Sequence, residues 1–368
     1  MKKYIIIALA ALAASVACSK VETVDLQKEI NFEVANSIQT KAFTGSVYSN
    51  GAFCTYAWFN DTDEFMVNEQ VDLAGGVWKT VDHTFYWPKT GSVSFISYSP
   101  FDGTSNTAGT TPVITKNKIT YTGVTADATD LMYADKAACS NNVNEVEDGT
   151  NSYTGVPTVF RHALAKLSFK VMANFIEWDD ASTGSHTEWE ITLNSFKISG
   201  FNTTGDLELN LNGDGKSWDK PVTTVDGVDY NVWTNVSGAT TAQELVASPI
   251  TLTTSEQDLA SATGFVLPQM LTAGVQTVDI DVDIKTTLAN GKVINENFAK
   301  TINISEISTL KAWQMNENIV YTIKFKPTAH STDPGVTPHD DDPEDVIIKF
   351  DPAVADWTDV SSTATIQI

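Results

Sequence analysis

Two acidic residues, Glu188 and Glu190, have a spacing that could support carboxylate chemistry. They flank Trp189, and residues two apart in an extended strand point to the same face of a sheet. Two carboxylates are the minimum that a glycosidase needs, although catalytic pairs usually come from different strands. We therefore interpret this pair as an exposed strand face and predict no catalytic residues there.

Three further carboxylates, Asp279, Asp281 and Asp283, alternate with apolar residues and resemble half of a calcium-binding loop. Such a loop needs a glycine for its sharp turn, and none follows here. The period of two is that of a strand with one solvated face. The histidines are scattered, with no pair at metal-ligand spacing on one element: His83, His162, His186, His330 and His339. We predict no metal site.

Known catalytic and cofactor motifs are also missing from the sequence. No segment matches the Gly-x-Ser-x-Gly elbow of hydrolases, a phosphate-binding loop or a dinucleotide fingerprint. We therefore expect no cofactor, and we expect that the protein is not an enzyme.

Cys18 is the residue with the clearest chemical role. It follows two lysines, an apolar stretch at residues 4–14 and the small residues 15–17, which together are typical of an export signal. The apolar stretch is shorter than the roughly 20 residues of a membrane-spanning helix. A cysteine at this position resembles the acylated cysteine of bacterial lipoproteins. We predict a lipoprotein signal peptide at residues 1–17 and lipidation, for example by palmitate, at Cys18.

A short strand and a basic residue follow the signal. Ile30, Phe32 and Val34 alternate with polar residues, which predicts a half-buried strand with one apolar face. Lys41 and Ala42 come next, among small residues and before a loop-like segment, where a protease could separate the strand from its domain. We interpret residues 18–41 as a lipidated spacer with a removable first strand.

Composition limits the classes of partner. The 368 residues carry a net charge of −23 and an isoelectric point near 4.4, whereas nucleic-acid binding requires clustered lysine and arginine. Arg161 is the only arginine, so bidentate clamps for phosphate or carboxylate ligands are nearly excluded. Hydrophobic residues make up 42% and aromatic residues 10%, enough for packed cores. We expect no nucleic-acid partner.

Two cysteines, Cys54 and Cys139, remain once Cys18 is assigned to lipid. An exported protein can form a disulfide between them, but two buried free thiols explain the pair equally well. The sequence leaves both readings open.

Turn dipeptides such as Asn50-Gly51 and Asp226-Gly227 recur along the chain and separate short β-branched and aromatic runs. Long stretches with a period of 3.6 are missing. This pattern is typical of antiparallel β-sandwiches, so we predict an all-β protein with two Ig-like sandwich domains in tandem. We place the first domain at residues 29–160 and the second at 161–326.

The C-terminal extension has two parts. Residues 327–345 are rich in proline and acidic residues and are predicted to form a linker. Residues 346–368 contain two strand-like runs, one at 346–350 and one in which Ala364, Ile366 and Ile368 alternate with polar residues. Terminal strands on a long linker suit pairing with another molecule, so both runs are candidate donor strands and the second is preferred.

The chain resembles the fimbrillins that build type V pili. The resemblance covers nearly all of the exported chain and rests on the order of these short pieces: Ile30-Asn31-Phe32, Thr40-Lys41-Ala42, Val77-Trp78, Tyr86-Trp87-Pro88, Phe95, Tyr98-Ser99-Pro100, Thr129-Asp130-Leu131-Met132, the run from Phe160 to Leu167, Leu267-Pro268-Gln269, Trp313, Tyr321 and Trp357.

The resemblance implies two transthyretin-like β-sandwiches, export as an outer-membrane lipoprotein and assembly into fimbriae that support adhesion. It also implies a trypsin-like maturation protease that cuts after a basic residue, here Lys41, and other pilus subunits as partners through donor-strand exchange. Family members best known for this reaction have arginine where this chain has lysine. Two alternatives are a surface glycan-binding lipoprotein with a similar fold and, with less support, an exported glycosidase.

Overall fold

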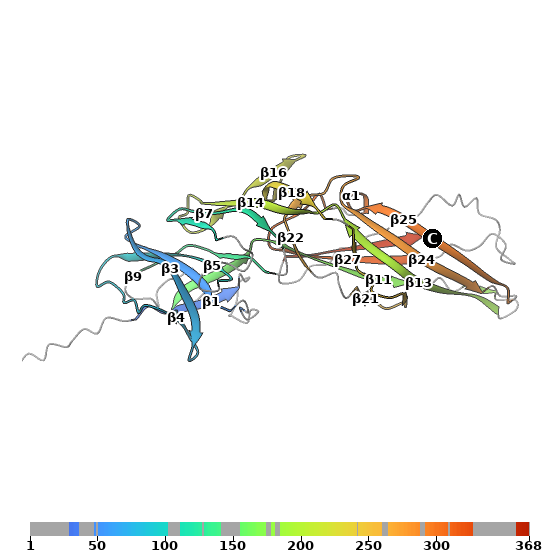
Figure 1. Cartoon of the computed structure of the whole chain (residues 1–368), viewed down its shortest axis with the longest axis horizontal. Helices are drawn as coiled ribbons and strands as arrows, with labels where there is room; N and C mark the ends of the chain where they lie inside the picture. The colour runs from blue at the N-terminus through green and yellow to red at the C-terminus, as the bar shows by residue number, and fades with distance from the viewer. Residues whose placement is uncertain are drawn as a thin grey trace, which may run out of the picture.

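The computed structural model describes residues 29–36, 48, 51–101, 111–126, 129–140, 155–173, 178–180, 185–240, 242–259, 264–287, 291–307, 310–326 and 358–367. Cys18, Lys41, Ala42, Ile368, the linker at 327–345 and the run at 346–350 lie outside these ranges. The described chain is almost entirely β-strand, as predicted, with one short helix, α1 (Ile304–Ile307). Figure 1 shows an elongated molecule with β1 and β4 towards one end and β13, β24 and β25 towards the other.

The first sheet gathers the strands at the β1 end. Its members are β1 (Phe32–Asn36), β2 (Phe53–Phe59), β3 (Asp63–Ala74), β4 (Val77–Thr80), β5 (Ser92–Ser99), β8 (Met132–Ala134), β9 (Ala137–Ser140) and β10 (Val156–His162). The strand order is β2-β3-β4-β1-β10-β8-β5-β9, and β2 also pairs with β5. These pairings close the sheet into a ring, and closure leaves no free edge between β4 and β10 as long as β1 is in place.

A second sheet packs against the outside of this ring. It contains β6 (Val113–Thr115), β7 (Lys118–Thr125), β14 (Asn202–Leu211), β15 (Trp218–Asp219) and β18 (Thr234–Ala239), while β16 (Val222–Val225) and β17 (Val228–Asn231) form a separate hairpin. Its central ladder joins β7 with β14, so strands from both sides of residue 160 share one sheet. The division of the chain at residue 160 stays a prediction, but packing is continuous across it.

Two more sheets form the sandwich at the other end. One contains β11 (Ala165–Ala173), β21 (Gln257–Asp258), β22 (Gly264–Val266), β27 (Glu317–Lys326) and β28 (Thr358–Gln367). The other contains β12 (Trp178–Asp180), β13 (Ser185–Ser199), β19 (Gln243–Glu244), β20 (Ile250–Thr251), β24 (Thr277–Thr287) and β25 (Val293–Asn303). A short pair, β23 (Gln269–Met270) and β26 (Ala312–Trp313), completes the fold.

Alternating side chains build the core between these two sheets. On β11, Leu167, Phe169 and Val171 are buried, and on β24, Val278 and Val282 face them from the other sheet. The intervening residues point to solvent, which is the period of two that the sequence predicted.

Three of the pairings are parallel, which the prediction of antiparallel sandwiches did not include. They join β1 with β10, β11 with β27, and β27 with β28. The two strands of each pair are far apart in the sequence, so no tight turn dictates that they run in opposite directions.

The two remaining cysteines are free and buried. Cys54 is opposite Tyr98 of β5, whereas Cys139 is opposite Val93 on the other side of β5. The two cysteines are two strands apart in the sheet and five residues apart along the strand direction, which corresponds to roughly 19 Å. This is far beyond the distance that a disulfide spans. Burial raises the pKa of each thiol to about 12, so both stay protonated near neutral pH.

Candidate functional site: the groove that holds β1

The predicted removable strand, β1, occupies a slot between β10 and β4. It runs parallel to β10 from Phe32, opposite Val156, to Asn36, opposite Phe160. On its other side it is antiparallel to β4, where Phe32 lies opposite Trp78. Backbone hydrogen bonds extend both ladders, because Ile30 N donates to the Phe85 carbonyl at 2.9 Å and Val156 N donates to the Asn31 carbonyl at 2.7 Å.

The side chains of β1, together with that of Ile30 just before it, fill the interior of the ring. Ile30 is 1% exposed and Phe32 is 4% exposed, and Val34 packs partly buried against the same core. The Phe32 ring makes edge-to-face contacts with Phe53 and Phe95, each at 5.7 Å between ring centroids. This is the alternation that the sequence predicted for Ile30, Phe32 and Val34. The structure shows where they pack, and their removal stays a prediction.

Aromatic side chains form the floor of the slot, and several of them were not singled out from the sequence. Phe53 and Phe160 contact each other at 5.3 Å, and Tyr48 stacks on Phe160 at 4.9 Å. Trp78 contacts both Tyr48 and Phe53. Burial raises the pKa of Tyr48 well above its usual range. The β-branched and aromatic residues at 156–160 could have indicated a strand here, but nothing near Tyr48 signals its role.

The segment with the predicted cleavage site lies between two fixed points. Asn36 pairs with Phe160 on one side of it, and Tyr48 is 7% exposed in the ring core on the other. Lys41 and Ala42 fall between these two residues, outside the described part of the chain. A cut there would leave β1 held only by its ladders and by the packing of its side chains.

The C-terminal strand β28 lies in a different setting. It pairs in parallel with β27 from Thr358, opposite Glu317, to Gln367, opposite Lys326. The register aligns Ala364 with Ile323 and Ile366 with Phe325, and the side chains of Ile323 and Phe325 are fully buried. Figure 1 shows β28 in red in the half of the molecule away from β1. The predicted donor strand therefore rests on the edge of its own second sandwich.

The other residues considered from the sequence have structural partners. Glu190 is paired with Lys285 at 3.3 Å. Asn297 donates to Asp281 at 2.7 Å and to Asp283 at 2.9 Å. Arg161 binds Asp135 through two hydrogen bonds, at 2.8 and 2.6 Å. Within the described ranges, no group of three His, Cys, Asp or Glu side chains could hold a metal.

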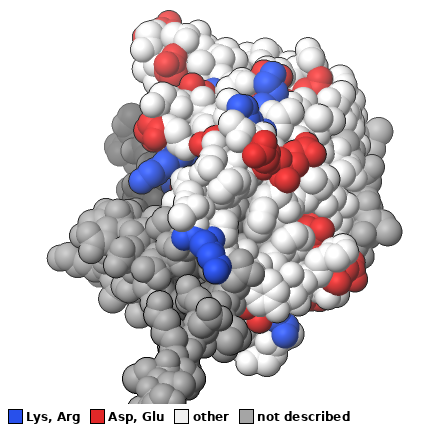
Figure 2. All heavy atoms as spheres, turned by 90° about the vertical axis from the view of Figure 1, so that its left-hand side faces the viewer, with Lys and Arg blue, Asp and Glu red and all other residues white. Residues whose placement is uncertain are grey.

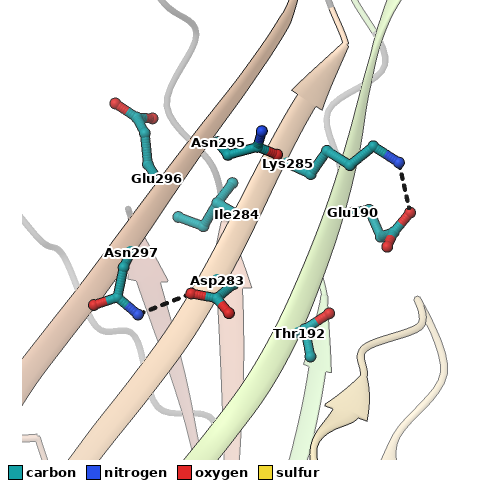
Figure 3. A pocket seen from close by; sticks show the side chains of 8 residues that line it. All are labelled: Glu190, Thr192, Asp283, Ile284, Lys285, Asn295, Glu296 and Asn297. Carbon is teal, nitrogen blue, oxygen red and sulfur yellow. Dashed lines mark hydrogen bonds and ion pairs between the residues drawn. The ribbon is translucent and has the colours of Figure 1, made fainter.

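A shallow depression of about 450 Å³ lies over β13, β24 and β25. Its lining is polar apart from Ile284 and includes no aromatic ring: Glu190, Thr192, Asp283, Ile284, Lys285, Asn295, Glu296 and Asn297 (Figure 3). The aromatic residues of the first domain could in principle form a sugar platform, but core packing was the preferred prediction for Trp78, Tyr86, Trp87, Phe95 and Tyr98. Trp87, Phe95 and Tyr98 are each at most 2% exposed and Trp78 is partly buried, as predicted, whereas Tyr86 is 47% exposed and does not pack in the core.

The surface at the β1 end gives no sign of a basic patch. Figure 2 looks onto this end, and its described atoms show isolated lysine and carboxylate groups on a mostly uncharged surface. Among the residues that the structure describes, no helix is long and apolar enough to span a bilayer.

Comparisons with known proteins were made at three levels. Curated proteins give no match. Among solved structures, a fimbrial protein from Bacteroides vulgatus has 16% sequence identity and a TM-score of 0.48, and the match covers 81% of this chain and 95% of that one. The fimbrial anchor protein Mfa2 from Porphyromonas gingivalis has 11% identity and a TM-score of 0.24, with 76% and 83% covered. The family comparison matches residues 40–357 to fimbrillin-like proteins, and the chain therefore belongs to the fimbrillin-like family.

Proposed function

We propose that this protein is a structural subunit of a type V fimbria that is exported as a lipoprotein through Cys18. A trypsin-like protease cuts it after Lys41, and it polymerises by donor-strand exchange at the outer membrane, where the fimbriae support adhesion. Membership of a family of fimbrial subunits supports the general role. The finer steps rest on the position of β1.

The observation that carries the proposal is that β1 closes the ring. Its neighbours β4 and β10 have no pairing with each other among the described strands, so loss of β1 opens two strand edges at once. Ile30 and Phe32 would also leave their buried positions. An apolar slot beside two unpaired edges is a surface that recruits another strand.

The energetics suit a replacement reaction. Full burial of one large apolar side chain contributes roughly 1.5–3 kcal/mol, so β1 contributes on the order of 5 kcal/mol through its three apolar residues before ordering costs. A fragment held by such a short strand alone can leave once it is no longer covalently attached. A neighbour's strand with similar alternation can then occupy the slot.

The donor is a C-terminal strand of another copy or of a related subunit. Ala364, Ile366 and Ile368 reproduce the spacing of Ile30, Phe32 and Val34, and the run at 346–350 is the second candidate. The slot for β1 and the strand β28 lie in opposite halves of an elongated molecule (Figure 1). Exchange between such sites is head-to-tail, which produces open fibres and not closed rings.

The test is to treat purified uncut protein with a lysine-specific protease and to follow polymer ladders on denaturing gels without boiling. Ladders should appear only after the cut, and they should be absent for Lys41→Ala and for a chain truncated before Val346. Lys79→Ala, at an exposed lysine of β4, is the matched control and should polymerise normally. Equal polymerisation of the truncated chain would show that the C-terminal strands are not the donors.

A further inference from the structure

The C-terminal extension contains a close repeat of the sequence that fills the β1 slot. The segment Ile348-Lys349-Phe350-Asp351-Pro352-Ala353 aligns without gaps with Ile30-Asn31-Phe32-Glu33-Val34-Ala35. The isoleucine, the phenylalanine and the alanine are identical, and the residue after the phenylalanine is acidic in both segments. Residues 348–353 lie outside the described part of the chain, so the match is one of sequence.

The two inward positions of this match are the ones on which the slot depends. Ile30 is 1% exposed and Phe32 is 4% exposed in the ring core. The ring of Phe32 lies edge-to-face against Phe53 and Phe95, each at 5.7 Å between ring centroids. Aromatic pairs in this geometry contribute stability beyond the area that they bury. The slot is therefore shaped for an isoleucine followed two residues later by a phenylalanine.

Ile348 and Phe350 have the residue types and the spacing of these two buried positions. The run at 363–368 instead aligns Ala364 and Ile366 with them. This alignment leaves the first position underfilled and removes the ring from the second. An underfilled core position is destabilising because the surrounding side chains relax only partly around the space. The segment at 348–353 thus fits the slot better.

Pro352 aligns with Val34, where a proline does not interrupt a ladder. Successive residues of a strand direct their backbone groups alternately to its two neighbours. Val156 N donates to the Asn31 carbonyl, so the odd-numbered residues of β1 bond to β10 and the even-numbered ones face β4. β4 begins at Val77, and its ladder with β1 does not reach Val34. Proline lacks an N–H and is tolerated in a strand where no ladder bond is needed.

We propose that residues 348–353 are the segment that enters the β1 slot of a neighbouring subunit. The segment runs in the direction of β1, parallel to β10, with Ile348 in the place of Ile30 and Phe350 in the place of Phe32. This assignment rests on the proposed function. It reverses the preference between the two donor candidates, because the slot requires a buried ring that the run at 363–368 lacks.

The chain before the segment is long enough for this transfer. Residues 327–347 follow the end of β27 at Lys326 and span roughly 70 Å when fully extended. They include the acidic run at 340–345, and charged linkers repel themselves and extend. The slot lies in the half of the elongated molecule away from β28 (Figure 1), so a donor on such a linker suits a neighbour placed end to end.

The first experiment compares ladder formation after the cut at Lys41. Every protein is the full exported chain with Cys18→Ser, which leaves out the lipid. Each also carries Lys349→Arg, so that the lysine-specific protease cannot cut within the donor. Ladders on denaturing gels without boiling should form for this parent chain, and they should also form for a chain that ends at Trp357 and lacks β28.

Two matched substitutions separate the donor candidates. Phe350→Ala in the parent chain should reduce the ladders at least about tenfold, because a buried ring is lost from the contact. Ile366→Ala, at the aligned position of the other run, should leave the ladders unchanged. Both residues lie outside the two sandwich cores, so circular dichroism of the uncut proteins should match that of the parent.

A second experiment measures occupation of the slot without any change to the chain. A synthetic peptide of residues 346–354 carrying Lys349→Arg, added in excess during cleavage of the parent chain, should suppress the ladders. It should also be recovered with the monomer by size-exclusion chromatography. The same peptide with Phe350→Ala, and a peptide of residues 362–368, should do neither.

The two proposals fail in distinguishable ways. Ladders that are lost with Ile366→Ala and kept with Phe350→Ala would overturn the assignment of residues 348–353 and leave donor-strand exchange intact. Suppression by the peptide of residues 362–368 alone would do the same. A parent chain that forms no ladder after the cut would contradict the proposed function, and the assignment with it.

Discussion

The two terminal strands of this chain are held in opposite ways. β1 lies between two neighbours, with Ile30 and Phe32 almost fully buried. Among the described strands, β28 pairs with β27 alone, although their ladder runs the whole length of β28. Loss of β1 opens a closed ring, whereas loss of β28 returns β27 to the edge of an otherwise complete sheet.

This difference underlies the unequal roles that we propose for the two ends. A strand that closes a ring leaves a specific vacancy with two ladders and an aromatic floor. A strand on an edge is the part of a sandwich that can leave with least damage to its own domain. The contrast supports the proposal that the β1 slot is the acceptor and the C-terminus the donor.

Deletion of each strand in turn should have the largest effect. A chain that begins at Ala42 should lose stability on the order of 5 kcal/mol in its first region, because three apolar side chains leave the core. Hydrogen exchange measured separately for residues 51–101 and 165–173 should show a large loss of protection only in the first. A synthetic peptide of residues 29–36 should restore part of it. Unchanged protection at 51–101 would contradict the role of β1.

Point substitutions within β1 should have smaller, graded effects on stability. Phe32→Ala in the uncut chain should cost about 3–5 kcal/mol, because a buried ring with two aromatic contacts is lost. Val34→Ala should cost clearly less, since Val34 is only partly buried. Denaturant unfolding of both variants would measure the difference. Equal losses would mean that β1 does not pack as described.

Truncation after Lys326 should have a smaller effect. The second sandwich keeps the pairing of β11 with β27 and its core between two sheets. We expect a modest decrease of the melting temperature and unchanged protection at residues 165–173. Complete unfolding of this sandwich would show that β28 is an integral strand and not a detachable one.

The smallest expected effect concerns Glu317, at the start of β27. Burial raises the pKa of its carboxyl group, although Gln314 donates two hydrogen bonds to it. The folded state therefore binds the proton more tightly than the unfolded state, and stability from this group is present at low pH and declines as pH rises through the folded pKa. Relative to Glu317→Gln, the natural chain should gain stability when the pH falls from 7 towards 5. An identical pH dependence of both proteins would contradict this.

The sequence predicted the all-β class and most of the strands, because alternation and glycine turns are local signals. β1 and β24 lie where the sequence alternates with a period of two, around residues 30–34 and 279–283. β3 was missed, because its charged and apolar side chains do not alternate regularly. Most of its side chains are exposed or half-buried, so charged residues are compatible with a strand at this position.

The closed ring and the parallel neighbours could not be predicted from the sequence. They depend on contacts between residues far apart in the chain, such as Phe32 with Trp78 and Val156. The same holds for Tyr48, which became part of the slot only through its packing on Phe160. Local patterns identified the strand that fills the slot, but only the three-dimensional structure identified the slot.

The central claim is that β1 leaves its slot when a neighbour's strand enters. The most direct measurement is mass spectrometry of the fragment that ends at Lys41, followed in the soluble and polymer fractions after cleavage of the purified chain. This fragment should appear in solution in step with polymer formation and should be missing from the polymer. One retained fragment per subunit in the polymer would contradict it.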